Sequence, residues 1–181
     1  FSFLAGVCIT RLLQQDGRGV FTTLQADVAM LALLLSFGMP AVLIYFLAKG
    51  EHPGRQVIGL AASLFVVLAL VVVIALATAA LGYLDLSRLL PPSSTGFDGF
   101  FVGASLLMSL LQSFLGSTFL GLREFRVGNR MYVVSALANF LAYGGLFWAY
   151  HNRPEDHVDL VLTAGLLVQF GLTGAWVWHY A

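Results

Sequence analysis

Six long apolar stretches separated by short polar connections fill this chain. They cover residues 1–13, 20–48, 57–84, 99–122, 131–150 and 158–181. A transmembrane helix needs ~20 mostly apolar residues to cross a hydrocarbon core ~30 Å thick. All but the first stretch reach that length, so the pattern predicts an all-α, polytopic membrane protein of about six transmembrane helices.

The composition agrees with a membrane protein. The chain is 59% hydrophobic and 10% charged, whereas a soluble domain has roughly 45–50% and 25%. Residues 64–77 do not alternate between apolar and polar, which excludes a strand of a membrane β-barrel. The net charge of +0 gives no field that would attract nucleic acid. The lone Cys8 cannot form an intrachain disulfide or a thiolate cluster, and no metal or cofactor is predicted.

The polar connections contain glycine, proline and charged residues. They cover residues 14–19, 49–56, 85–98, 122–130 and 151–157. In the first, Gly17 and Gly19 predict a turn, because glycine readily adopts a positive φ. The first stretch reaches Arg11 after ten residues, too few to span a bilayer. We therefore expect the chain to be a piece of a larger, transporter-sized protein.

The basic residues predict an orientation. Connections two and four carry five of them: Lys49, Arg55, Arg123, Arg126 and Arg130. On the other side there are four: Arg18, Arg88 and Arg153 in the connections, and Arg11 at the helix end just before the first connection. Because cytoplasmic loops are enriched in Lys and Arg, connections two and four are predicted to face the cytoplasm.

The second stretch holds two unusual features. Asp27 is a charged residue inside an apolar segment, where a charge is costly. It is either a cavity carboxylate, which pairs with an arginine or binds a coupling cation, or an interfacial acid near a helix N-terminus. Farther on, Gly38 and Pro40 interrupt the stretch, since proline removes a helix hydrogen bond and bends the segment. They are candidates for a hinge.

Three later stretches carry polar faces at helical spacing. The fourth has Ser105, Ser109, Gln112, Ser113, Gly116, Ser117 and Gly121; the fifth has Ser135, Asn139 and Tyr143; the sixth has Gly165, Gln169 and Thr173. These faces either line a hydrated cavity or hydrogen-bond between helices. Gly99 and Gly103 are interpreted as a close helix-packing pair. Residues 64–77 carry no strongly polar side chain and are predicted to face lipid.

Two segments carry a resemblance to a known family. Residues 11–19 read RLLQQDGRG, and residues 35–49 read LSFGMPAVLIYFLAK. Together they resemble the polysaccharide biosynthesis flippases of the multidrug/oligosaccharidyl-lipid/polysaccharide exporter superfamily, although Gln14 and Gln15 stand where that family often has glycine and proline. Residues 121–126, GLREFR, and Asn129 resemble the family's short loop after the fourth helix.

The resemblance implies a transporter of two six-helix lobes, of which residues 1–181 would be the N-terminal one and a second lobe the missing partner. Such O-antigen-type flippases move undecaprenyl-pyrophosphate-linked oligosaccharides across the bacterial plasma membrane by alternating access. Arg11 and Arg18 match positions suited to an anionic substrate, since arginine binds phosphate through a planar fork. An anchor in the lipid headgroups is the competing interpretation of both.

Other functions stay open at this point. A cation-coupled multidrug exporter of the same superfamily is one alternative, although residues 1–10 contain no acidic residue. A non-transporting membrane subunit that packs through its small-residue faces is another. An enzyme is not expected, because the sequence shows no paired carboxylates, activated nucleophile or phosphate-binding loop.

Overall fold

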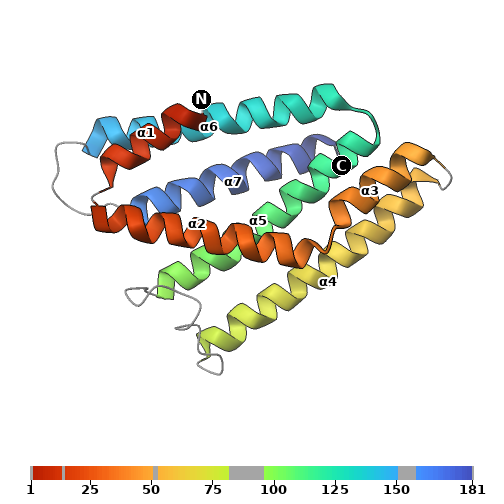
Figure 1. Ribbon diagram of the computed structural model, residues 1–181, viewed down its shortest axis with the longest axis horizontal. Helices are drawn as coiled ribbons and strands as arrows, with labels where there is room; N and C mark the ends of the chain where they lie inside the picture. Colours follow the sequence, from red (N-terminus) through yellow and green to blue (C-terminus); the bar gives the residue numbers. More distant parts are fainter. Residues whose placement is uncertain (1, 14, 51–52, 82–95, 151–157, 181) are drawn as a thin grey trace. The chain divides into compact units, whose positions relative to one another are not determined.

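The computed structural model describes residues 2–13, 15–50, 53–81, 96–150 and 158–180. Within them the chain forms helices and no strand (Figure 1). The helices are α1 (Ser2–Leu12), α2 (Gln15–Ser36), α3 (Met39–Lys49), α4 (Gly54–Ala80), α5 (Gly96–Gly121), α6 (Phe125–Tyr150) and α7 (Val158–Tyr180). Among the described residues, five helices are long and apolar enough to cross a membrane: α2, α4, α5, α6 and α7. The predicted all-α, polytopic class is confirmed.

The chain divides into two compact units. Unit 1 comprises Phe1–Ala26 and Arg130–Ala181, and unit 2 comprises Asp27–Asn129. Unit 1 therefore holds α1, the start of α2, most of α6, and α7. Unit 2 holds the rest of α2, α3, α4, α5 and the first residues of α6.

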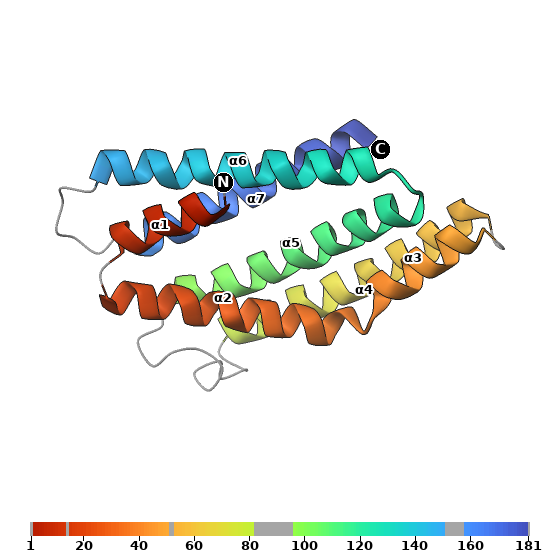
Figure 2. The same cartoon turned by 45° about the horizontal axis from the view of Figure 1, so that its top comes forward.

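In unit 2, α3, α4 and α5 pack against one another (Figure 2). Val72 of α4 forms a buried apolar cluster with Leu106 and Leu110 of α5. Glycine allows two of the close approaches. A Cβ on Gly103 would overlap the side chain of Leu76, and a Cβ on Gly121 would lie 2.7 Å from the Cβ of Leu47. The prediction that Gly103 serves helix packing is confirmed.

One side of α4 is exposed and apolar. Eight of its large side chains are at least half exposed: Leu60, Leu64, Val66, Val67, Leu70, Val71, Val73 and Ile74. The opposite side faces α5 through Phe65, Val72 and Leu76. This division is the one expected of a transmembrane helix that contacts lipid on one side and protein on the other.

In unit 1, α6 and α7 run antiparallel (Figure 1 and Figure 2). Leu24 of α2, and Val161 and Leu162 of α7, have no exposed surface. The guanidinium of Arg18 donates a hydrogen bond of 2.9 Å to the carbonyl of Thr10, near the C-terminus of α1. This bond satisfies one of the carbonyls that a helix end leaves free.

Two predicted connections are shorter in the structure. The turn predicted at residues 14–19 is wrong, because α2 begins at Gln15 and the glycines with positive φ in the described residues are Gly38 and Gly50. Gly17 is helical, since glycine permits a turn but does not require one. Likewise, α6 begins at Phe125, so little of the connection predicted at residues 122–130 is outside a helix. Most of connection 85–98, and all of 151–157, lie outside the described residues.

Candidate functional site

The second predicted stretch is a broken helix. Between the end of α2 at Ser36 and the start of α3 at Met39, Phe37 has a φ of 45° and Gly38 a φ of 73°. Both are left-handed, which ends the right-handed helix; glycine adopts this conformation freely, whereas phenylalanine does so at a cost. The interruption predicted around Gly38 and Pro40 is present.

Proline fits the restarted helix. Pro40 lies in the first turn of α3, where a helix does not use the backbone N–H that proline lacks. The amides of Ala41 and Val42 both donate to the carbonyl of Gly38, at 3.0 and 3.2 Å. On the other side of the break, the hydroxyl of Ser36 donates to the carbonyl of Leu33 at 2.9 Å. The break is thus stabilised locally on both sides.

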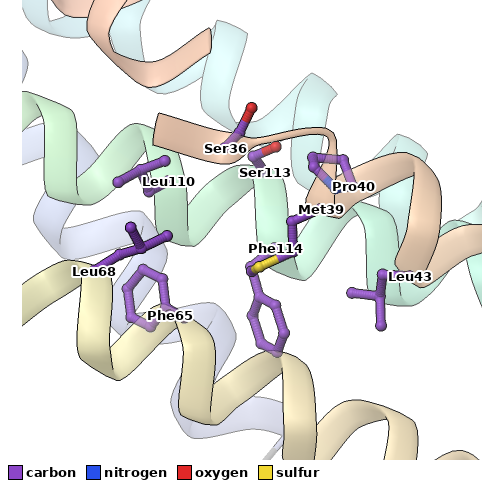
Figure 3. A pocket seen from close by; sticks show the side chains of 9 residues that line it. All are labelled: Ser36, Met39, Pro40, Leu43, Phe65, Leu68, Leu110, Ser113 and Phe114. Atoms are coloured by element: carbon purple, nitrogen blue, oxygen red, sulfur yellow. The ribbon is translucent and has the colours of Figure 1, made fainter. Parts of the chain in front are cut away.

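A small pocket lies beside the break, within unit 2 (Figure 3). Its lining side chains come from α2, α3, α4 and α5: Ser36, Met39, Pro40, Leu43, Phe65, Leu68, Leu110, Ser113 and Phe114. The rings of Phe65 and Phe114 stack across it with centroids 6.1 Å apart. The cavity volume is about 10 Å³, enough for about one water molecule. In this conformation the pocket is too small for a sugar.

Of the predicted site residues, Pro40 lines this pocket. Ser109 and Gln112 are half-buried on α5 but do not line it. Ser36 and Ser113 line the pocket but are not among the site residues predicted from the sequence. Ser113 belongs to the polar face predicted for α5, so its signal was present, whereas nothing in the sequence distinguished Ser36.

Buried polar atoms without partners mark other positions. Among the described residues they are Asp27 Oδ2, Ser105 Oγ and Gln169 Oε1. A buried polar group without a hydrogen bond costs about 1–3 kcal/mol. Each of these three oxygens can therefore accept a hydrogen bond from a water molecule or a ligand. Asp27 and Gln169 are two of the site residues predicted from the sequence.

The depth of Asp27 follows from the bounds of the span. The apolar part of α2 runs from Gly17 to Ser36, and Asp27 lies ten residues after its start. At ~1.5 Å per residue this is ~15 Å, half of a ~30 Å hydrocarbon core. Asp27 therefore lies between the limits of a candidate membrane span.

In unit 1, a tyrosine of α6 ends against a glycine of α7. A Cβ on Gly165 would lie 2.5 Å from the hydroxyl of Tyr143, so the tyrosine ring, 7% exposed, ends against the glycine. Because the helices are antiparallel, helix periodicity would place Asn139 level with Gln169 one turn along from this contact. A further turn along, it would place Ser135 level with Thr173. We call these three levels the α6–α7 polar ladder.

Some of the polar groups in this ladder have hydrogen-bond partners and others do not. The amide nitrogen of Asn139 donates to the carbonyl of Ser135 at 2.9 Å, within its own helix. Gln169 Oε1 is buried and has no partner within the described residues. The middle level therefore combines an amide engaged on α6 with a free acceptor on α7.

The two arginines predicted as site residues, both in unit 1, differ in their contacts. Arg18 is engaged with Thr10, as described above. Arg11 lies in the last turn of α1 and is exposed. The predicted residues thus fall into two sets, with Arg11, Arg18, Asn139 and Gln169 in unit 1, and Asp27, Gly38, Pro40, Ser109 and Gln112 in unit 2.

No group of three or more His, Cys, Asp or Glu residues that could hold a metal ion occurs in the described ranges. Comparison with protein-family models, with curated proteins and with solved structures found no match to this chain. The fold is that of a polytopic all-α membrane protein. Its second apolar stretch is broken between α2 and α3, and the candidate span in α2 contains the acidic residue Asp27.

Proposed function

We propose that this chain is part of a flippase that moves undecaprenyl-pyrophosphate-linked oligosaccharide across the bacterial plasma membrane. The observation that carries the proposal is the broken segment α2/α3, with its left-handed residues Phe37 and Gly38. Transporters commonly build their binding sites and moving parts around such discontinuous helices. The resemblance of residues 11–49 to polysaccharide flippases supports this class of substrate.

The break provides a place for alternating access. Movement of α3 relative to α2 would change φ and ψ at Phe37 and Gly38 and leave the two helices intact. The pocket beside the break would open or close in the same movement, because Ser36 lines it from α2 while Met39 and Pro40 line it from α3. A second lobe of the same protein would supply the other wall of the path.

The polar side chains suit the two parts of the substrate. An oligosaccharide presents many hydroxyl groups, and amides such as those of Asn139 and Gln169 donate to and accept from hydroxyls. The pyrophosphate needs cationic partners, because an unpaired anion in an apolar medium is very costly. Arg11 suits this role better than Arg18, whose guanidinium already binds the Thr10 carbonyl.

A second function is favoured by one observation. The carboxyl of Asp27 has a buried oxygen without a partner, within a membrane span. Such a carboxyl is suited to bind a coupling cation, as in a cation-coupled multidrug exporter. In a flippase the same carboxyl would couple substrate movement to an ion. Asp27→Asn removes the charge of this side chain and keeps its shape. If the protein is a multidrug exporter, this variant should stop the export of small cationic drugs.

Replacement of Arg11 tests the proposal. We expect Arg11→Ala to lower polysaccharide export about tenfold or more, because a charge-assisted hydrogen bond contributes about 1.5–3 kcal/mol and about 1.4 kcal/mol corresponds to a factor of ten. Arg11→Lys is expected to restore export partly, since lysine keeps the charge but lacks the planar fork. The measurement is surface polysaccharide in cells that depend on this protein.

The control is Arg130→Ala, which removes an exposed arginine from α6. Its export is expected to equal that of the wild type. Full export by a well-expressed Arg11→Ala, Arg18→Ala double variant would remove both arginines from the substrate path and leave them as interfacial anchors.

A further inference from the structure

Four helix ends meet at one end of unit 2. A Cβ on Gly121, the last residue of α5, would lie 2.7 Å from the Cβ of Leu47 and 3.3 Å from the Cα of Ile44, both in α3. A Cβ on Gly54, the first residue of α4, would lie 3.8 Å from Leu47. Because α6 begins four residues after Gly121, its start lies here too. In Figure 2 the end of α3, the start of α4 and the end of α5 lie together at the right.

This end coincides with the limits of three candidate membrane spans. The spans begin at Gly54, end at Gly121 and begin again at Phe125. The side chains at these limits and just beyond them would therefore lie at the level of the lipid headgroups. We call this region, made of residues 47–50, 53–56 and 121–129, the basic end.

The basic end carries a surplus of positive charge. Its charged residues are four exposed bases, Lys49, Arg55, Arg123 and Arg126, and one acid, Glu124. Glu51, in the same connection as Arg55, lies outside the described residues, and counting it the bases still outnumber the acids by four to two. Within the described part of the chain, the guanidinium groups of Arg55, Arg123 and Arg126 have neither an ion pair nor a hydrogen bond. Lys49 Nζ lies 5.4 Å from the centroid of the Tyr45 ring, a cation–π contact.

Exposed apolar side chains are interleaved with these bases. Leu122 and Phe125, which flank Arg123, are 46% and 56% exposed, and Tyr45 is 55% exposed. Aromatic and apolar groups beside Lys and Arg are typical of a surface that enters the boundary between headgroups and acyl chains. A free polyanion in water would gain nothing from Leu122 and Phe125.

The backbone at Arg123 would suit glycine better than arginine. α5 ends in a Schellman motif, in which the amide of Glu124 donates to the Phe119 carbonyl at 2.8 Å and the amide of Arg123 to that of Leu120 at 3.1 Å. Arg123 takes the left-handed position of this motif with a φ of 62°, where glycine is the usual residue. This backbone conformation is costly for arginine, and its presence supports a role for the Arg123 side chain.

We infer that the basic end binds the phosphate groups of anionic phospholipid headgroups. The three guanidinium groups, which have no partner among the described residues, are matched to phosphate by their planar fork of donors. The coincidence with the span limits and the exposed Leu122 and Phe125 place the ligand in the membrane surface. This inference depends on the geometry of unit 2 and is independent of the proposed transport function.

The test is native mass spectrometry of the full chain in detergent, titrated with phosphatidylglycerol or phosphatidylcholine. The wild type is expected to retain phosphatidylglycerol in preference to phosphatidylcholine. The variant Arg55→Gln, Arg123→Gln, Arg126→Gln is expected to bind phosphatidylglycerol at least about tenfold more weakly, since each base near an anionic surface contributes measurably to attraction. Arg153→Gln, which removes one charge from connection 151–157, is the control and should bind like the wild type.

Arg123→Gly separates binding from folding. Glycine relieves the left-handed backbone, so this variant is expected to unfold at the same temperature as the wild type or higher, yet to bind phosphatidylglycerol more weakly. Unchanged binding in both the triple variant and Arg123→Gly would overturn the inference. So would equal weakening by Arg153→Gln. If millimolar inorganic phosphate competes fully with the lipid, the basic end is a site for free phosphate and the lipid assignment is wrong.

Discussion

At the scale of single residues, Tyr143 and Gly165 define the register of the α6–α7 polar ladder. The absence of a side chain at Gly165 is what lets the Tyr143 hydroxyl reach α7. In that register Asn139 would lie level with Gln169, whose buried Oε1 has no partner in the described residues. The approach of the Tyr143 hydroxyl to α7 therefore depends on a glycine that has no polar group of its own.

We predict that Gly165→Ala lowers the stability of the protein by about 1–3 kcal/mol, the usual cost of overpacking. Tyr143→Phe in the same background should recover much of this loss, because it removes the hydroxyl that the new methyl group meets. The measurement is the free energy of unfolding in detergent micelles for both single variants and the double variant.

The matched control is Gly171→Ala, also in α7, where an added Cβ meets no atom within 4 Å. This variant should be neutral or stabilising, since alanine favours a helix over glycine. Equal destabilisation by both alanines would mean that the Tyr143 contact does not constrain the helix pair.

The sequence predicted the residues of the ladder but not their pairing. The spacing of Asn139 and Tyr143, and of Gly165 and Gln169, placed each pair on one helix face. Periodicity within one helix contains no information on which turn of a neighbour it meets. That information came from the contact between Tyr143 and Gly165.

At the scale of elements, the break between α2 and α3 combines two separate causes. Proline at position 40 only prevents a hydrogen bond to the preceding turn, which membrane helices often accommodate with a bend. The left-handed conformations of Phe37 and Gly38 are what separate the two helices. The sequence predicted an interruption from Pro40, but Phe37 gave no sign of its unusual backbone.

We predict that Gly38→Ala destabilises the protein by about 1–2 kcal/mol, because a side chain disfavours the left-handed conformation by that amount. No clash contributes, since a Cβ on Gly38 would meet no atom within 4 Å. The thermal unfolding midpoint in detergent would show the change.

Gly59→Ala in α4 is the control for this prediction. Its added Cβ also has open space, and Gly59 is helical. We expect it to be neutral or to raise the midpoint. An unchanged midpoint for Gly38→Ala would mean that the break relaxes to an ordinary helix at little cost.

Helix ends were the least predictable part of the elements. Polar residues at 14–19 and 122–130 suggested connections, yet α2 begins at Gln15 and α6 at Phe125. In a membrane protein, charged residues belong to helix turns that extend into the headgroup region as readily as to loops. Hydropathy therefore located the spans but extended the connections beyond their true limits.

At the scale of the whole molecule, the distribution of basic residues predicts that connections two and four face the cytoplasm. In unit 2 these two connections lie at the same end, because Gly121 contacts Ile44 and Leu47. Single cysteines at Gly54 and at Ser94, in a background without Cys8, are expected to react with a membrane-impermeant thiol reagent from opposite sides. In intact cells, labelling of the Gly54 position from outside would show that the orientation is opposite to the predicted one.

The central claim is that the protein moves a lipid-linked oligosaccharide between leaflets. The direct measurement uses the full protein, reconstituted in vesicles that contain a fluorescent undecaprenyl-pyrophosphate-linked oligosaccharide, and follows quenching by a membrane-impermeant reagent. We predict faster exposure of the inner-leaflet lipid than in protein-free vesicles, and slower exposure with Arg11→Ala than with the wild type. Exposure at the protein-free rate, by protein that is shown to be folded in the same vesicles, would contradict the claim.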